Sequence, residues 1–413
     1  MRRLQLMTSK PVLYVCNVGE SEAAGAIADR GGERFGRYSI IGLPVRRVAT
    51  FRGHTLQIHD RDSHDDVLRI LKEEGAPEKV VLHCFSGDVT MARECVDRGY
   101  VLSFSGTVTF TNATELQEAA RLVGDIARRH EVKKVIKTKS MVTEEMRLNE
   151  VLGQMGVQSI ETDLGEYILQ INDNEPPSHI IAPVVHKDKD EIADLFAKTH
   201  DRPRLTEITD MTREAREMLR PHFMSADMGV TGGNFVVAET GSVVLVTNEG
   251  NEGMCTVMPR VHVAVTGIEK VLPTLEDLAT AMRLLPRSAT GQASSNYFSL
   301  LTGPRGAGDQ DGPEHMYVVL VDGGRTGLIG GDFQDMLRCI RCGACMNHCP
   351  VYQKVGGHAY GWVYPGPMGS VLTPSYVGID KALDLPQAAT LCGECNSVCP
   401  VGIPLSDLLR KLR

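Results

Sequence analysis

Two cysteine runs near the C-terminus decide how this part of the chain folds: Cys339-Ile-Arg-Cys342-Gly-Ala-Cys345-Met-Asn-His-Cys349-Pro350 and Cys392-Gly-Glu-Cys395-Asn-Ser-Val-Cys399-Pro400. Thiolates at three-residue spacing, followed by a further cysteine before a proline, form the ligand run of a cubane iron–sulfur cluster. In two-cluster ferredoxins the last cysteine of each run ligates the cluster of the other run. This wiring predicts one [4Fe-4S] cluster bound by Cys339, Cys342, Cys345 and Cys399.

The second predicted cluster has an incomplete cysteine set. Its ligands are Cys349, Cys392 and Cys395, and Ala389 stands where the pattern requires the first cysteine of the second run. The second site is therefore predicted to hold either a [3Fe-4S] cluster or a [4Fe-4S] cluster with a different fourth ligand. Water, Thr390 or a group from a partner could supply that ligand, and an open iron could bind a hydroxy acid.

A zinc site and a disulfide framework are the two alternatives for these cysteines. Zinc uses four ligands, often as C-x2-C pairs, and a repeated run that ends in proline fits it poorly. Disulfides need an oxidising compartment, and the chain shows no signal peptide, which predicts a cytoplasmic protein. The remaining cysteines are predicted to be reduced and buried: Cys16, Cys84, Cys95 and Cys255.

Composition places the chain among globular proteins with ordinary cores. Its 413 residues allow two or three domains, and 42% hydrophobic and 23% charged residues are typical values. A net charge of −8 argues against a nucleic-acid binder that relies on a basic surface. No run of the sequence approaches the roughly 18 apolar residues of a membrane span.

Between residues 123 and 330, short apolar runs alternate with helical patterns, which predicts a mostly parallel α/β sheet. Strands are expected over 134–137, 159–162, 235–238, 243–247, 261–265 and 317–321, and helices over 143–154, 189–196 and 213–224. A glycine-rich linker over 327–332 predicts a boundary before the cysteine module of residues 331–413.

Polar residues follow several of these strands. Open α/β sheets bind ligands at the carboxyl ends of their strands, so these residues form the candidate pocket: Lys137, Lys139, Glu161, Asp163, Asn234, Asn248, Glu249 and Asn251. The two lysines could face a carboxylate substrate or a partner. Gly232, Gly233 and Gly250 are predicted to supply positive φ for turns. No nucleophile–base pair stands out, so the catalytic residues are unknown.

Several longer runs carry a family resemblance: Lys137-Thr-Lys-Ser-Met-Val-Thr-Glu-Glu145, Glu161-Thr-Asp-Leu-Gly-Glu166, Gly267-Ile-Glu-Lys270 and Gly356-Gly-His-Ala-Tyr-Gly361. From about residue 123 onward the chain resembles the lactate-utilisation protein B family, an iron–sulfur component of bacterial L-lactate oxidation. The resemblance implies a LUD domain, similar to the NagB/RpiA/CoA-transferase type, over 123–330. For residues 331–413 it implies an α-helical ferredoxin-type module.

The same resemblance implies a function and partners. The chain would be an electron-transfer subunit, and so part of an oxidoreductase, in the conversion of L-lactate to pyruvate. Its partners would be LutA-like and LutC-like subunits, with an unknown electron acceptor. Members of the family usually continue past the position of Arg413, which implies a shortened C-terminus.

Residues before 123 resemble fragments of three other proteins. Residues 56–122 are similar to a slice of a TatD-type metal-dependent deoxyribonuclease, through Ile58-His-Asp-Arg-Asp62, His83-Cys-Phe-Ser-Gly87 and Ser103-Phe-Ser-Gly106. Within residues 1–55, the run from Gly32 to Gly42 resembles anthranilate synthase component I, and the run from Lys10 to Val18 resembles an Obg-like ATPase. None is a whole domain, so a fragmentary α/β region is expected.

The TatD resemblance implies divalent-metal ligands at His59 and His83. Two imidazoles make a weak site, because hydrolytic metals use three or more protein ligands and an open water position. The other metal ligands of that family are missing from the matching context. Two alternatives to the lactate function follow: a non-functional mosaic around a core of the lactate-utilisation type, and a less favoured metal-dependent nuclease.

Overall fold

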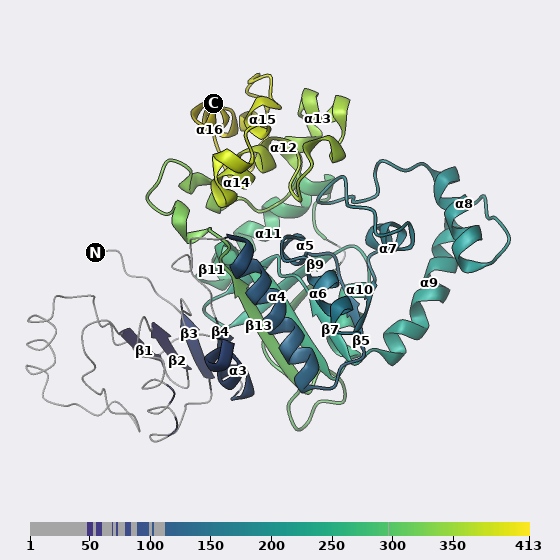
Figure 1. Cartoon of the computed structure of the whole chain (residues 1–413), viewed down its shortest axis with the longest axis vertical. Coiled ribbons are helices and arrows are strands. Elements are labelled where there is room, and N and C mark those ends of the chain that lie inside the picture. Colours follow the sequence, from purple (N-terminus) through teal and green to yellow (C-terminus); the bar gives the residue numbers. More distant parts are fainter. Residues whose placement is uncertain are drawn as a thin grey trace, which may run out of the picture.

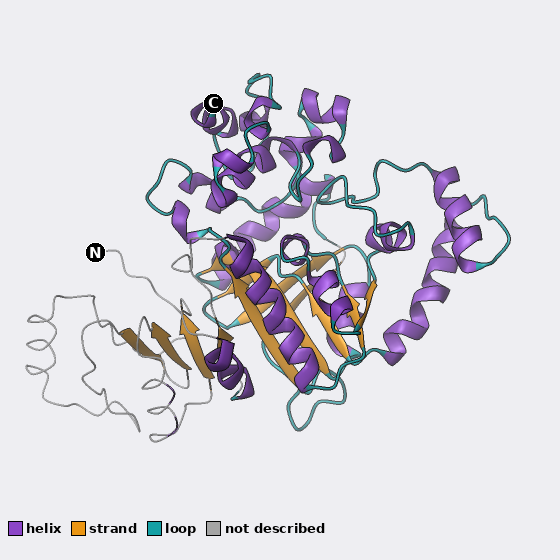
Figure 2. Ribbon diagram, viewed as in Figure 1, coloured by secondary structure: helices purple, strands orange, loops and turns teal. Residues whose placement is uncertain are grey.

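The structure, a computed structural model, describes residues 48–52, 55–59, 68, 72, 79–83, 89–98, 101–102, 112–295 and 297–413. A central α/β domain carries a helical C-terminal module at one end and a small sheet from residues 48–102 at one side (Figures 1 and 2). The predicted α/β class and helical C-terminal module are confirmed. Residues 1–47, with Cys16 and most of the predicted Obg-like and anthranilate-synthase-like fragments, lie outside the described residues. No helix in the described part is long and apolar enough to cross a membrane.

The central sheet has five strands in the order β13-β10-β7-β5-β6, and each neighbouring pair is parallel. Its strands are β5 (Lys134–Lys137), β6 (Gln158–Glu161), β7 (Met228–Thr231), β10 (Val261–Gly267) and β13 (His315–Val321). Every residue of β10 is buried, because Val263 belongs to the core under the helix of residues 112–129 and Ala264, on the opposite face, packs with Val236 and Val243. The prediction of a parallel sheet is confirmed for these strands.

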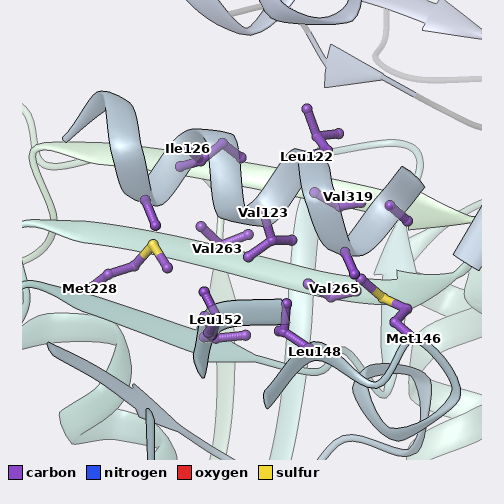
Figure 3. Close-up of a cluster of buried hydrophobic side chains, with 14 of the residues drawn as sticks. Leu122, Val123, Ile126, Met146, Leu148, Leu152, Met228, Val263, Val265 and Val319 are labelled. Atoms are coloured by element: carbon purple, nitrogen blue, oxygen red, sulfur yellow. The ribbon is translucent and has the colours of Figure 1, made fainter. Parts of the chain in front are cut away.

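Alternate residues of β5 face two different helical layers. Val135 belongs to the core under α4 (Asn112–Arg129) and α6 (Leu148–Gln154), whereas Ile136 packs with the opposite layer. Figure 3 shows Val123 and Ile126 of α4 lying over side chains of the central strands. The opposite layer consists of α7 (Leu164–Ile171), α8 (Lys189–His200), α9 (Ile208–Ser225) and α10 (Asn251–Val257).

The helix predicted over 143–154 is wrong as a single element. It forms two helices, α5 (Met141–Glu145) and α6, separated at Arg147, whose φ of 53° is left-handed. The break lets Glu145 reach Arg325 at 2.7 Å while Leu148 is fully buried in the core. One continuous helix would fix the relative directions of these two side chains.

A second, mixed sheet was not expected from the sequence. Its order is β11 (Val271–Leu272), β8 (Phe235–Val237), β9 (Ser242–Thr247) and β12 (Tyr297–Leu301), covered by α11 (Leu275–Thr290). Only the β11–β8 pair in it is parallel. Gly241, at a φ of 70°, forms the turn between β8 and β9.

The prediction of positive φ at Gly232, Gly233 and Gly250 is wrong, since none of the three has a left-handed backbone. Close packing explains the first two glycines. A Cβ on Gly232 would lie 3.1 Å from Ser140 Oγ, and one on Gly233 would lie 3.2 Å from Thr266 Cβ. The glycines let two neighbouring chain segments approach each other at the strand ends.

The C-terminal module is built from short helices around one buried helix, α14 (Gly366–Val377). Around it lie η3 (Thr326–Leu328), η4 (Gln334–Arg338), α12 (Ala344–Asn347), α13 (Pro350–Val355), η5 (His358–Tyr360), η6 (Ile379–Lys381), η7 (Leu385–Gln387), α15 (Glu394–Ser397) and α16 (Leu405–Leu412). Met346, Leu372 and Leu409 are among its buried core residues.

A third sheet precedes the central domain. It contains β1 (Val48–Arg52), β2 (Thr55–His59), β3 (Lys79–His83) and β4 (Val101–Leu102), with α3 (Val89–Asp97) between the last two strands. Met91 and Cys95 of α3 join the core beneath α4, and Arg129 donates to the carbonyl of Asp97 at 2.6 Å. This part of the N-terminal region therefore packs on the central domain.

Candidate functional site

The two cysteine runs form equivalent loops. Cys342 corresponds to Cys392, and each is flanked by two left-handed residues: Arg341 and Gly343 at φ 59° and 77°, and Leu391 and Gly393 at φ 57° and 84°. Each loop then leads into a one-turn helix, α12 or α15. Alternating left-handed residues turn successive backbone N–H groups toward one point, an arrangement that favours anionic sulfur.

Four thiols line one small cavity in the C-terminal module. They belong to Cys339, Cys342, Cys345 and Cys399, and apolar side chains such as Met368, Ile403 and Leu405 complete the walls. The N–H of Ile403 lies 3.4 Å from Cys399 Sγ. The structure thus brings together the four residues that the sequence assigns to the first cluster.

The chemistry of this cavity fits a metal–sulfide cluster. Burial, together with the neighbouring sulfur of Cys339, raises the pKa of the Cys342 and Cys345 thiols. Backbone N–H groups of Ala344 and Met368 oppose that shift by hydrogen bonding to the two sulfurs. Bare thiolates are therefore disfavoured here, and a cationic group must replace the protons before the sulfurs can act as ligands.

The second trio of cysteines lies beside the first. Cys395 interacts electrostatically with Cys349 and Cys392, and Cys345 of the first set interacts with Cys395. Cys392 is exposed, and hydrogen bonds from the Glu394 N–H and the Thr390 side chain lower its pKa. Thr390 therefore lies within reach of this site.

Beside the first cysteine loop, a cavity of about 640 Å³ opens at the carboxyl ends of the central strands. Five of the eight predicted pocket residues line it: Lys139, Asp163, Asn234, Asn248 and Glu249. Ile340 and Arg341 of the cysteine module form another part of its wall. The cavity thus lies between the central domain and the first predicted cluster.

The other three predicted pocket residues are buried behind this wall. Lys137 Nζ lies 2.9 Å from Glu161 Oε1 and 3.0 Å from Glu144 Oε1, so its charge is matched inside the domain. Asn251 donates from Nδ2 to Thr162 Oγ1 at 3.4 Å. These contacts join the ends of neighbouring strands and helices, and a ligand role for the three residues stays a prediction.

Sequence reasoning missed several charged residues of the cavity. Glu252 lines it, and burial, reinforced by Asp163, raises its pKa to about 8. Lys270 and Glu269 also line it, and both fall in the Gly267–Lys270 run that carried the family resemblance. That run was the available signal, but it gave no indication that these side chains meet the cysteine module.

A buried chain of ion pairs joins the two parts of the molecule. Arg325 lies 2.7 Å from Glu145 and 2.7 Å from Glu269, and Glu269 also lies 3.1 Å from Arg341. Arg325 and Glu269 are 0% and 1% exposed, and Lys270 donates to the carbonyl of Cys339 at 2.6 Å. The geometry of the first cysteine loop is thereby coupled to the central sheet.

His59 and His83 are register partners on the neighbouring parallel strands β2 and β3. Their side chains lie outside the described residues, as do Cys84 and the run from Ser103 to Gly106. Metal binding by this pair stays a prediction.

Three family models match the chain. The LUD domain matches residues 107–321, the TatD related DNase matches residues 46–125, and the 4Fe-4S dicluster domain matches residues 335–403. The last match indicates iron–sulfur clusters at the cysteine module. The predicted resemblances to the LUD and TatD types are confirmed.

Curated relatives named "Lactate utilization protein B" are similar over 308 residues. Identity is 48% with the protein from Geobacillus kaustophilus, 50% with that from Shouchella clausii and 47% with that from Bacillus subtilis. Each alignment covers 75% of this chain and 64% of the relative. The chain thus spans less than two thirds of the length of these relatives.

Proposed function

This chain belongs to the LUD domain family, and from that premise we propose that it is an iron–sulfur electron-transfer subunit of an L-lactate oxidation system. The observation that carries the proposal is the cavity lined by Cys339, Cys342, Cys345 and Cys399. Support also comes from the similarity to lactate utilization protein B. The proposed partners are LutA-like and LutC-like subunits in the cytoplasm.

Clusters held by the two cysteine sets supply one-electron transfer. The protein fixes the sulfurs with backbone N–H groups and excludes water from the first site with Met368, Ile403 and Leu405. Arg341 and Lys270 place positive charge beside Cys339. Because Leu391 replaces Arg341 in the equivalent loop, we propose that the first site accepts an electron more readily than the second.

Iron and acid-labile sulfide quantitation on anaerobically reconstituted protein, with EPR before and after dithionite, tests the proposal. Two clusters give about 8 irons per chain, or about 7 if the second is a [3Fe-4S] cluster, which gives a signal in the oxidised state. About 4 irons per chain would mean that only one cluster assembles, so electrons could not pass between two clusters within the chain. Absence of iron would contradict the proposal and favour the mosaic alternative.

Replacement of Ala389 by cysteine is expected to complete the second ligand set. Ala389 occupies the position that corresponds to Cys339 in the first run. If the second wild-type site holds a [3Fe-4S] cluster, the Ala389→Cys protein should bind about one more iron per chain and lose the oxidised-state EPR signal. Ala388→Cys adds a thiol one position away and is the matched control. For a wild type with a [3Fe-4S] cluster, equal iron and an unchanged EPR signal in Ala389→Cys would contradict this expectation.

A further inference from the structure

Away from the cysteines, three side chains of the types that bind metal ions lie close together. In the described part of the chain, Glu175, His186 and His358 place one ligand atom each within 4.8 Å of one another. His186 Nε2 is 2.9 Å from Glu175 Oε1. The centroids of the two imidazole rings are 4.5 Å apart, and the rings are inclined at 62° rather than stacked.

Hydrogen bonds fix which nitrogen of each histidine carries the proton. His358 Nε2 lies 2.8 Å from the carbonyl oxygen of Pro176, which can only accept, so Nε2 is the donor and Nδ1 is bare. The Glu175 carboxylate can only accept, so His186 Nε2 carries the proton and donates to Glu175 Oε1 at 2.9 Å. His186 Nδ1 is therefore bare and accepts from Ser178 Oγ at 2.6 Å.

These outer contacts are the ones that metal-binding histidines make. A ligating imidazole almost always donates its second N–H to a carbonyl, a carboxylate or a similar oxygen, which orients the ring. His358 does so through Pro176, and Ser178 Oγ lies 2.6 Å from His186 Nδ1, where it can accept the second N–H when a metal ion replaces the proton on Nε2. The proton between His186 and Glu175 thus marks the position that a metal ion would take.

Glu175 is held so that one oxygen stays available. Lys187 and Asn172 both bond to Oε2 at 2.7 Å, which leaves Oε1 directed toward His186. Burial works against ionisation, but hydrogen bonds from Lys187, Asn172 and His186 lower the pKa of Glu175 to about 2. The carboxylate is therefore charged at neutral pH.

We propose that Glu175, His186 and His358 bind a divalent transition-metal ion, with Zn²⁺ as the best match to two imidazoles and one carboxylate. Zinc bonds of 2.0–2.2 Å place tetrahedral ligand atoms about 3.4 Å apart, so small side-chain rotations close the site. Water fills the fourth position, which a cavity lined by Glu175, Pro176 and His358 makes accessible.

The metal ion joins two parts of the chain. Glu175 and His186 follow α7 of the central domain, whereas His358 begins η5, between the two cysteine runs. The segments already touch, because Tyr352 donates to the carbonyl of Ser178 at 2.7 Å. A Cβ on Gly357 would lie 1.7 Å from that carbonyl oxygen, so only glycine lets His358 come this close. The site is therefore structural and fastens the cysteine module to the central domain.

Zinc titration of the cluster-loaded protein under anaerobic conditions, followed by calorimetry, tests the proposal. We expect one Zn²⁺ per chain with a Kd in the micromolar range or tighter, and a rise in Tm on binding. Glu175→Gln, His186→Gln and His358→Gln should each weaken binding at least tenfold. His348→Gln is the matched control, because His348 lies in the same module and bonds only to the carbonyl of Ala344 among described contacts.

Zinc X-ray absorption separates this site from adventitious binding to cysteine. Nitrogen and oxygen ligands lie at about 2.0–2.2 Å, and sulfur lies at about 2.3 Å. A nitrogen and oxygen shell that is lost in His358→Gln supports the proposal. A sulfur shell, unchanged affinity in His358→Gln, or no stoichiometric binding would overturn it. Iron content measured on each variant verifies that the module is folded.

Discussion

Replacement of Cys399 by alanine is expected to abolish the first cluster, although Cys399 belongs to the second cysteine run. Its sulfur shares a cavity with Cys339, Cys342 and Cys345 rather than with its sequence neighbours Cys392 and Cys395. Loss of one thiolate leaves three ligands in an enclosed apolar site. We expect the EPR signal of the first reduced [4Fe-4S] cluster to disappear and iron per chain to fall, by about half if the site is lost and by about one iron if the three remaining thiolates hold a [3Fe-4S] cluster.

The last cysteine of each run is assigned to the cluster of the other run, and a second variant tests that assignment. Cys349→Ala should remove the second cluster, since Cys349 interacts with Cys395 although it follows the first run. Cys95→Ala is the control, because Cys95 is a buried thiol outside the module. Iron, sulfide and EPR measurements on the three proteins distinguish the cases. Wild-type iron in Cys399→Ala, or loss of the same signal in both variants, would contradict the assignment.

Removal of one charge from the buried ion-pair chain is expected to be the most destabilising single substitution. Arg325 contacts Glu145 and Glu269 at 2.7 Å, and all three side chains are at most 8% exposed. Arg325→Met would leave two buried carboxylates without this partner. Breaking a buried pair on one side costs about 3–5 kcal/mol, because the remaining charge is uncompensated.

Urea unfolding of cluster-loaded protein, monitored by circular dichroism under anaerobic conditions, measures this effect. Glu269→Gln should also destabilise the protein, and the double variant should lose less than the sum of the single losses. Glu217→Gln is the control, because the Arg202–Glu217 pair has the same 2.7 Å separation but is 40% and 54% exposed. Its effect should stay below about 1 kcal/mol. Equal losses in Arg325→Met and Glu217→Gln would refute the expected difference.

Sequence patterns predicted those strands and helices whose own residues carry the apolar periodicity. Apolar runs such as Val261–Gly267 are long and β-branched, so the parallel strands could be predicted. The thiol set of the first cavity also followed from spacing. The strands β8 and β9 were predicted, but their place in a second sheet was not, because β8 pairs with the two-residue β11 and β9 pairs with the distant β12. Likewise, a helical pattern through residues 143–154 gives no sign of the break at Arg147, next to which Glu145 contacts the distant Arg325.

The candidate pocket shows the same limit. Lys137 and Lys139 are two positions apart at the end of one predicted strand, and no local pattern distinguishes their roles. In the structure Lys137 is paired internally with Glu161, whereas Lys139 lines the cavity. Arg341 lies within the cysteine run, and the pattern of that run indicates sulfur ligands but not a wall of the cavity. Its place in the cavity wall depends on how the cysteine module packs on the central domain, and a local sequence pattern does not predict that packing.

Helix α4 has consequences for how such a chain could arise. One side of it, with Val123 and Ile126, covers the central sheet, while Asp125 and Arg129 hold α3 of the preceding unit. Recombination within such a helix preserves the core on one side whatever gene segment is joined upstream. The preceding segment contributes apolar contacts to that helix, which Met91 and Cys95 of α3 make here. A helix with two contact faces is thus a position where a different preceding segment can be joined without interrupting a strand of the central sheet.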